Sequence, residues 1–160
     1  MNQMIHPEKG NRRIAIIRAR WHADIVDQAV QSCQADLEND GCAVDIFDVP
    51  GALEIPLTAQ KLAKTGRYDG VVAIAFIVNG GIYHNNFVST SVSDAMMRVS
   101  LDTDTPVFSV ALTPHNYQEV EPLNEFFVKH FVKKGHEAAK AVKETLDLYA
   151  QIEAGDTAKV

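Results

Sequence analysis

The residues of this chain that could do chemistry follow four apolar runs, each close to the point where the run ends. Trp21 follows the first run, Glu54 the second, His84 the third and His115 the fourth. A tryptophan ring can stack on a planar heterocycle, a glutamate can accept hydrogen bonds from ligand hydroxyls, and a histidine can transfer protons near neutral pH. The sequence therefore offers four candidate segments for a small-molecule site.

Each of these residues also has an ordinary structural interpretation. Trp21 could cover a core edge or an interface, Glu54 could complement a helix dipole, and His84 could be a structural residue in a first helical turn. Gly80 and Gly81 allow a positive φ and close approach of the backbone to a carbonyl or phosphate, although a Gly-Gly pair alone is weak evidence. Residue types and spacing leave both interpretations open.

Metal and thiol chemistry are disfavoured by spacing. No pair among the six histidines lies at i,i+4 with a carboxylate as third ligand, so we expect no metal site. Cys33 and Cys42 are the only cysteines and form no CxxC pair. Cys33 falls in the apolar stripe of a predicted helix, which indicates a buried thiol.

The elements that must position these residues alternate along the chain. Apolar runs predict strands over 13–19, 42–48, 71–78 and 107–113, and the run at 71–78 has the pattern of a strand buried on both faces. Helical spacing predicts helices over 22–41, from the Pro50-Gly51 turn to Gly66, over 87–101, and from about 122 to 152 with a break at Gly135.

This alternation predicts an α/β fold, a three-layer sandwich with a four-stranded parallel flavodoxin-like sheet flanked by helices. We expect one domain over 1–160, with a loose arm at 1–11 and a frayed tail at 153–160. The carboxyl ends of parallel strands share one rim, so the four candidate segments should meet there. A sheet this small leaves apolar surface for a partner, which favours a homo-oligomer.

Composition excludes several function classes. The net charge is -6 with no basic stripe, which disfavours a nucleic-acid partner. No apolar run approaches the roughly 20 residues of a membrane span, and the N-terminus lacks a signal-peptide pattern, so we expect a cytoplasmic protein without a membrane partner. The loops also lack the phosphate loop of a flavodoxin and the acidic residues of a response-regulator receiver.

Five segments, RARWHADIV, DVPGALEIP, AFIVNGGIYHNNFV, PVFSVALT and KKGHEAA, resemble lumazine synthases in the order and spacing of that family. The resemblance spans nearly the whole chain, and PGA-x-EIP is its most specific motif. It implies condensation of 5-amino-6-(D-ribitylamino)uracil with 3,4-dihydroxy-2-butanone 4-phosphate to give 6,7-dimethyl-8-ribityllumazine, phosphate and water. It also implies that no metal or organic cofactor takes part.

The resemblance assigns roles to individual residues. Trp21 would stack on the pyrimidine, Glu54 would bind the ribityl hydroxyls and His84 would transfer protons. The other residues that it implies for substrate binding are Ala52 and Leu53 at the ribityl chain, Phe76, Ile77 and Val78 through their backbone, Gly80, Gly81 and Ile82 at the phosphate turn, and Ser109, His130 and Lys134 from the next subunit of a pentamer.

The phosphate side departs from the usual family pattern. Ile82 stands where a threonine is usual, Phe126 falls at the position of an arginine, and His130 at that of a lysine. We therefore expect a divergent subtype with a weaker grip on the phosphate substrate. The alternative is a flavin- or lumazine-binding oligomer with little catalysis. Assembly is expected to be a pentamer or a dimer of pentamers.

Overall fold

The structure, a computed structural model, describes residues 12–77, 85–112 and 121–155. Its elements in chain order are β1 (Arg13–Ala19), α1 (Ala23–Asn39), β2 (Ala43–Val49), the short 3-10 helix η1 (Ala52–Glu54), α2 (Ile55–Lys64), β3 (Gly70–Phe76), α3 (Asn85–Thr103), β4 (Val107–Leu112) and α4 (Glu121–Glu153). The strands and α-helices match the predicted elements to within one or two residues, except that the helix predicted from the Pro50-Gly51 turn begins as η1 and becomes α-helical only at Ile55.

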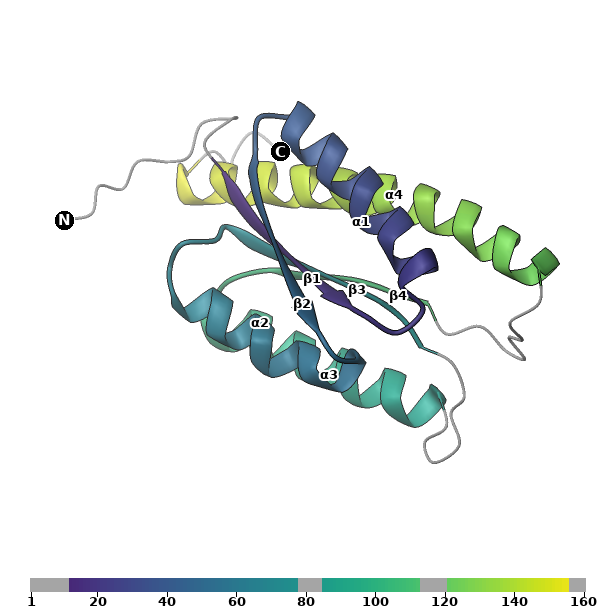
Figure 1. Cartoon of the computed structure of the whole chain (residues 1–160). Coiled ribbons are helices and arrows are strands. Elements are labelled where there is room, and N and C mark those ends of the chain that lie inside the picture. Colours follow the sequence, from purple (N-terminus) through teal and green to yellow (C-terminus); the bar gives the residue numbers. More distant parts are fainter. Residues whose placement is uncertain (1–11, 78–84, 113–120, 156–160) are drawn as a thin grey trace.

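The described strands form one parallel sheet in the order β2-β1-β3-β4. Figure 1 shows α1 and α4 on one face of this sheet and α2 and α3 on the other. The predicted α/β fold with a four-stranded parallel, flavodoxin-like sheet between helical layers is confirmed. The sheet places β2 and β4 at its two edges.

Each strand supplies side chains to two separate cores because successive side chains point to opposite faces. In β1, Ile14 and Ile16 pack under α1 and α4, whereas Ala15 and Ile17 pack under α2 and α3. Every residue of β3 is buried, as expected for a central parallel strand covered on both faces. Cys33 is fully buried in the core beside α1, which confirms its prediction as a core thiol.

The predicted helix break at Gly135 is wrong, because α4 runs without interruption from Glu121 to Glu153. Gly135 instead marks the place where α4 crosses α1. A Cβ at this position would lie 1.9 Å from Ser32 Oγ and 2.4 Å from Ala29 O. Ser32 Oγ also donates a 2.8 Å hydrogen bond to Val132 O. The absence of a side chain at residue 135 therefore permits a close helix crossing.

Parts of the predicted chain ends and loops fall outside the described residues. The arm at 1–11 and most of the tail, 156–160, are among them, while α4 ends at Glu153 and a turn follows to Gly155. The single-domain assignment over 1–160 stays a prediction. Among the described residues, no helix is both long and apolar enough to cross a membrane.

Candidate active site

Three of the candidate segments lie side by side at the carboxyl ends of β2, β1 and β3. Trp21 follows β1, η1 follows β2, Phe76 ends β3 and Ile77 follows it. These strands are consecutive in the sheet, and neighbouring strands lie about 4.8 Å apart. The three segments therefore fall within about 10 Å across the strands, a span suited to one small heterocycle with a side chain.

Trp21 presents its ring to solvent from a fixed piece of backbone. The side chain is 68% exposed, while Arg20 N donates to Val49 O at 3.1 Å. His22 adopts a left-handed conformation, with φ 58° and ψ 49°, and its carbonyl accepts hydrogen bonds from the first turn of α1. The His22 ring packs edge-on against Phe76 at 5.4 Å between centroids. An exposed indole on a held backbone is a suitable stacking platform.

The η1 turn, which follows the strand next to β1, carries an exposed carboxylate. Glu54 Oε1 lies 3.3 Å from the position that a Cβ on Gly51 would occupy, so the carboxylate rests over the Pro-Gly turn. Glu54 N donates to Gly51 O at 3.2 Å, and Glu54 O accepts from Thr58 Oγ1 at 2.8 Å. Leu53 is exposed and Ala52 is half-buried against the core under α2 and α3. The carboxylate is thus available to accept hydrogen bonds from ligand hydroxyls.

The end of β3 offers main-chain groups because its side chains are used by the cores. Phe76 is buried and packs on Phe127 and Phe131, with centroid distances of 5.1 Å and 5.6 Å. Ile77 is buried in the opposite core. The expected backbone role of these residues agrees with this arrangement. Their neighbours Val78, Gly80, Gly81, Ile82 and His84 lie outside the described residues, so their roles stay predictions.

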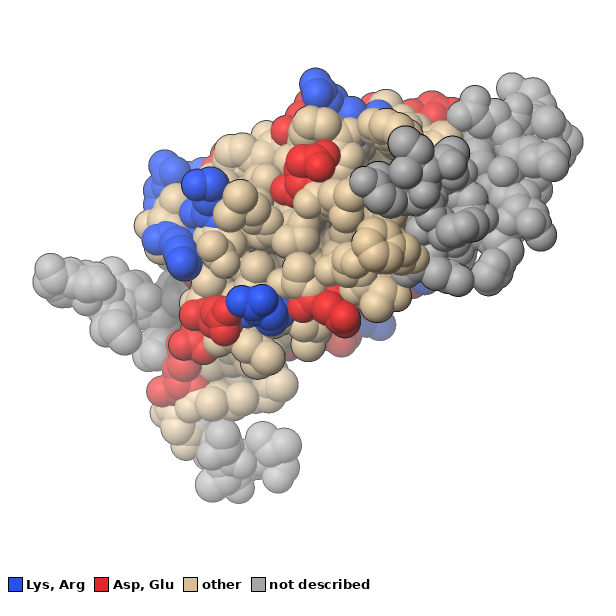
Figure 2. All heavy atoms as spheres, turned by 90° about the horizontal axis from the view of Figure 1, so that it is seen from below, with Lys and Arg blue, Asp and Glu red and all other residues tan. Residues whose placement is uncertain are grey.

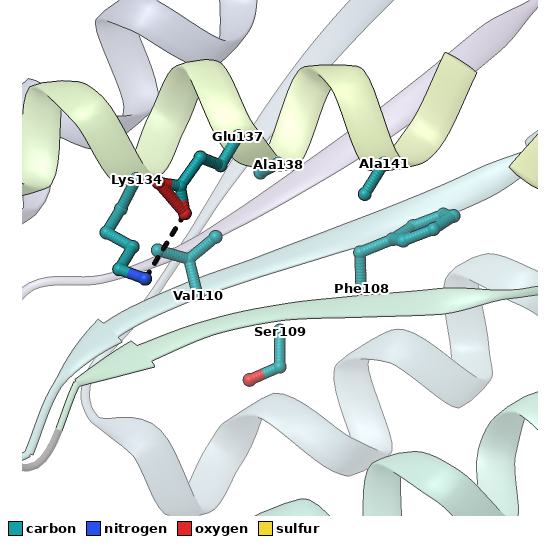
Figure 3. A pocket seen from close by; sticks show the side chains of 7 residues that line it. All are labelled: Phe108, Ser109, Val110, Lys134, Glu137, Ala138 and Ala141. Carbon is teal, nitrogen blue, oxygen red and sulfur yellow. Dashed lines mark hydrogen bonds and ion pairs between the residues drawn. The ribbon is translucent and has the colours of Figure 1, made fainter. Parts of the chain in front are cut away.

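A second group of predicted residues lies along the β4 edge. An open hollow of about 290 Å³ between β4 and α4 is lined by Phe108, Ser109, Val110, Lys134, Glu137, Ala138 and Ala141. Figure 3 shows Phe108 and Val110 pointing toward α4, whereas the Ser109 side chain points to the other side of the strand. Lys134 Nζ lies 3.2 Å from Glu137 Oε1. The alternation of β4 therefore directs Ser109 away from Lys134.

His130 lies one turn before Lys134 on the same helix, and an aromatic neighbour holds its ring. The rings of Phe126 and His130 are stacked, with 5.8 Å between centroids and an interplanar angle of 8°. Phe126 is itself exposed. Positions 126, 130 and 134 recur at i,i+4 and share one face of α4. An aromatic ring, an imidazole and an ammonium group thus form one stripe.

The two groups are not brought together within one chain. Two strands, β1 and β3, separate β4 from β2, so the strand axes of β2 and β4 lie about 14 Å apart. Ser109 pairs with Ala73, three residues before Phe76, which adds about 10 Å along the strand direction. Within one chain, Ser109 therefore lies well apart from the segments that carry Trp21 and Glu54.

Sequence reasoning missed Arg18, which joins three of the elements around the rim. Its Nε lies 2.8 Å from Asp48 Oδ1 on β2, and its Nη1 lies 3.3 Å from Asp27 Oδ1 on α1. The hydrogen bond with Asp48 raises the pKa of Arg18 and holds the pKa of the Asp48 carboxyl below its ordinary value. The available signal was a charged residue, Arg18, that interrupts the apolar run of strand RIAIIRA after Arg13.

The described residues hold no group of three or more His, Cys, Asp and Glu side chains arranged to bind a metal ion. What the described part of the rim provides is an aromatic platform, a carboxylate and main-chain groups. Those features suit binding and orientation of a polar heterocycle.

Comparisons with known proteins point to one family. A family model described as 6,7-dimethyl-8-ribityllumazine synthase matches residues 11–150. The 6,7-dimethyl-8-ribityllumazine synthase of Rhodococcus erythropolis is 51% identical over 146 residues, covering 89% of this chain and 94% of that protein. The 6,7-dimethyl-8-ribityllumazine synthase 2 of Pseudomonas syringae pv. tomato is 50% identical, covering 89% and 84%. That of Bradyrhizobium diazoefficiens is 46% identical, covering 84% and 82%.

Proposed function

The chain belongs to the 6,7-dimethyl-8-ribityllumazine synthase family, and on that premise we propose that it is a transferase of riboflavin biosynthesis. It condenses 5-amino-6-(D-ribitylamino)uracil with 3,4-dihydroxy-2-butanone 4-phosphate to give 6,7-dimethyl-8-ribityllumazine. The observation that carries this assignment to the site is the exposed Trp21 ring after β1, the central strand of the three, with the η1 carboxylate after β2 on one side and the main chain at the end of β3 on the other.

Each part of the pyrimidine substrate has a matching group at the rim. Trp21 stacks on the planar ring, and Glu54 accepts hydrogen bonds from ribityl hydroxyls that pass Ala52 and Leu53. The backbone at Phe76 and Ile77, continued by Val78, meets the polar edge of the uracil. This division agrees with the burial of Phe76 and Ile77, whose side chains are committed to the two cores.

The reaction needs positioning and proton transfer more than strong electrophilic assistance. The 5-amino group of the uracil attacks the ketone and loses water to give an imine, phosphate leaves by elimination, and attack by the ribitylamino nitrogen closes the ring with loss of water. His84 shuttles the protons. Holding two reactants side by side lowers the barrier by up to about 7–11 kcal/mol in well-oriented cases, so the rim acts mainly as a template.

The phosphate substrate is held partly by a neighbouring copy of the chain. Gly80, Gly81 and Ile82 supply backbone N–H groups from one subunit, while the next subunit supplies His130 and Lys134 from α4. Ser109 reaches in from β4 of that same subunit, on the side of the strand away from Lys134. The separation of these two groups within one chain supports this arrangement.

The protein is therefore a homo-oligomer, a pentamer or a dimer of pentamers, with sites between subunits. Exposed apolar side chains on α2 and α3, including Leu57, Met97 and Leu101, are available for such contacts. Figure 2 looks onto the side of these helices and shows a wide area without charged side chains. Its substrates are small molecules, and its expected location in the cytoplasm stays a prediction.

Turnover with both substrates tests the proposal. Purified full-length protein should form the fluorescent lumazine well above the uncatalysed rate, and His84→Ala should lose most of this acceleration. Lys134→Ala should raise KM for the phosphate substrate, whereas Lys140→Ala, a matched change on an exposed face of α4, should not. Normal binding of a ribityl-pyrimidine analogue without turnover would instead support the alternative function, a flavin- or lumazine-binding oligomer with little catalysis.

A further inference from the structure

Arg18 lies between the two segments that flank the proposed pyrimidine pocket. It precedes Trp21 by three residues on β1 and pairs in register with Asp48, the next-to-last residue of β2. Asp48 is followed by Val49 and then by the turn into η1. A bond between Arg18 and Asp48 therefore joins the backbone that leads to Trp21 with the backbone that leads to Glu54.

The guanidinium also engages α1, whose start defines the other side of the Trp21 turn. Asp27 accepts from Arg18 Nη1 at 3.3 Å, and Asp48 accepts from Nε at 2.8 Å. The Arg18 side chain is 28% exposed, and its contact with Asp27 is partly shielded from water, whereas its contact with Asp48 is exposed. The planar guanidinium can hold two carboxylates in fixed directions at once, which a lysine ammonium on a flexible stem does less well.

Backbone bonding reinforces the same junction. Arg20 N donates to Val49 O, which extends the pairing of β1 with β2 past the end of the sheet ladder. Trp21 itself is mostly exposed, so little packing fixes its ring. Its direction must come from the chain on either side, between Arg18 and the left-handed turn at His22.

We propose that Arg18 is a positioning residue for the pyrimidine substrate, because its guanidinium fixes the Trp21 platform relative to the η1 turn that carries Glu54. This inference rests on the proposed function for its kinetic consequences. Arg18 does not contact the substrate in this scheme. It acts through Asp48 and Asp27, and it lowers the cost of ordering the pocket when the ligand binds.

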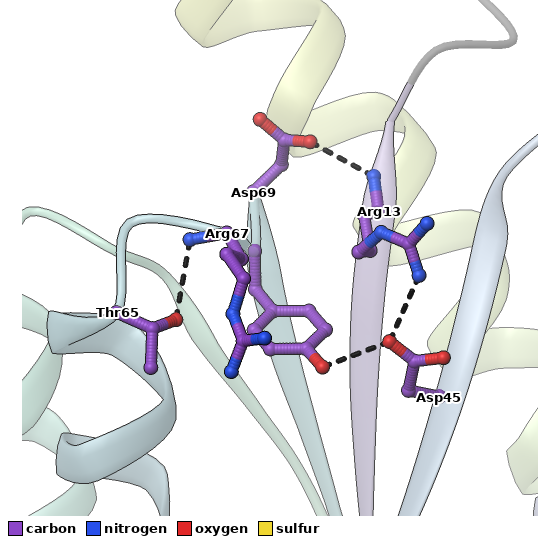
Figure 4. Close-up of polar contacts among 6 residues, drawn as sticks. Arg13, Asp45, Thr65, Arg67 and Asp69 are labelled. Carbon is purple, nitrogen blue, oxygen red and sulfur yellow. Dashed lines mark hydrogen bonds and ion pairs between the residues drawn. The ribbon is translucent and has the colours of Figure 1, made fainter.

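The opposite end of the same two strands provides a matched control. Arg13 at the start of β1 pairs with Asp45 of β2 at 2.9 Å, and Tyr68 donates to the same carboxylate oxygen at 2.8 Å. Figure 4 shows this cluster, with Asp69 accepting from Arg13 N. Arg13→Met thus removes the same charge and an equivalent cross-strand ion pair, at the end of the sheet away from the site.

Kinetics with each substrate varied separately test the positioning role. Arg18→Met and Asp48→Asn should each raise KM for the ribitylaminouracil about 3- to 10-fold, with kcat and KM for the butanone phosphate changing less than about 2-fold. Arg18→Lys should fall between. Arg13→Met should leave all three constants unchanged. Equal effects of Arg18→Met and Arg13→Met would overturn the proposal, as would no change in Arg18→Met.

Fluorescence separates failure of this inference from failure of the proposed function. Trp21 is the only tryptophan, so time-resolved anisotropy of the ligand-free protein reports its local motion without any catalysis. The local motion of Trp21 should increase in Arg18→Met and not in Arg13→Met. Thermal unfolding of both variants shows that each is folded at the temperature of the measurement. If neither the unsubstituted protein nor any variant forms product, the proposed function is wrong. The anisotropy measurement still tests the positioning role of Arg18 in that case. Unchanged Trp21 motion in folded Arg18→Met refutes it.

Discussion

At the scale of single residues, the rim separates exposed side chains, which we propose bind substrate, from buried side chains that support the fold. Trp21 has an exposed ring on a constrained backbone, whereas Phe76 is wholly committed to the core. Removing the exposed Trp21 ring breaks few packing contacts. The substitution should therefore reduce the affinity for the pyrimidine substrate more than the free energy of unfolding.

Trp21→Ala should therefore weaken binding of the pyrimidine substrate without a comparable loss of stability. Stacking of an aromatic side chain on a base contributes about 1–3 kcal/mol, which corresponds to a rise in KM of roughly 5- to 150-fold. Steady-state kinetics and thermal unfolding of the same preparation measure both effects. Tyr149→Ala, which removes an exposed aromatic ring from α4, is the control. An unchanged KM in Trp21→Ala would contradict the stacking role.

Tyr68 predicts a pH dependence at the other end of the sheet. The pKa of Tyr68 is raised above its ordinary value of 10.0, mainly by burial and next by the hydrogen bond to Asp45. The folded state therefore retains this proton more tightly than the unfolded state. The associated stability is complete below pH 10 and is lost as pH rises through the raised folded pKa.

Denaturant unfolding measured across the alkaline range, together with phenolate absorbance, tests this expectation. Tyr68→Phe should be less stable near neutral pH, because the Asp45 carboxylate loses a donor. It should also lose part of the decline in stability above pH 10. An identical alkaline profile in Tyr68→Phe would assign that decline to other groups.

At the scale of secondary-structure elements, α4 makes two different contributions. One side crosses α1 closely at Gly135, and another carries the stripe of Phe126, His130 and Lys134, of which Lys134 lines the hollow beside β4. The position of the crossing along the helix also sets where that stripe lies relative to β4. Packing and the proposed substrate binding would therefore be linked through one helix.

Gly135→Ala should destabilise the fold strongly. The added methyl group would meet Ala29 O as well as Ser32 Oγ, and the backbone atom cannot rotate away. Overpacking of this kind costs about 1–3 kcal/mol and sometimes more. Chemical denaturation measures the loss. Adding Ser32→Ala should recover only part of it, because the clash with Ala29 O remains, and full recovery would show that the hydroxyl alone sets the limit.

Phe126→Arg should strengthen binding of the phosphate substrate. A guanidinium at this position supplies five donors and can still stack on the His130 ring. We expect KM for the butanone phosphate to fall about 3- to 10-fold, with KM for the ribitylaminouracil unchanged. Phe126→Leu is the control for loss of the ring. If KM for the butanone phosphate fell equally in Phe126→Arg and Phe126→Leu, the gain would come from loss of the phenyl ring and not from the guanidinium.

At the scale of the whole molecule, the sequence predicted what local patterns encode. The apolar run from Val71 to Val78 indicated a strand buried on both faces, and the alternation of elements indicated the parallel sheet. Gly135 was misread because its partner Ser32 lies on a helix about 100 residues away, and a glycine inside a helical pattern resembles a break.

The supporting residues of the site were harder to predict for the same reason. Arg18 gains its significance from Asp48 and Asp27, which lie on two other elements. The relation of Ser109 to Lys134 depends on which side of β4 each occupies, and residue spacing alone does not give that. Residue types identified ligand-facing candidates, whereas the contacts that hold them required the three-dimensional arrangement.

The crossing of α1 and α4 also has a consequence for biosynthesis of the chain. Ser32 bonds to Val132, and Asp36 to His136, so each bond joins residues 100 positions apart. While the ribosome is still making the chain, the apolar face of β1 and β3 beside α1 stays uncovered until α4 emerges. We expect nascent chains that stop before residue 121 to be aggregation-prone and to depend on chaperones. Full-length chains should complete folding only near their release from the ribosome.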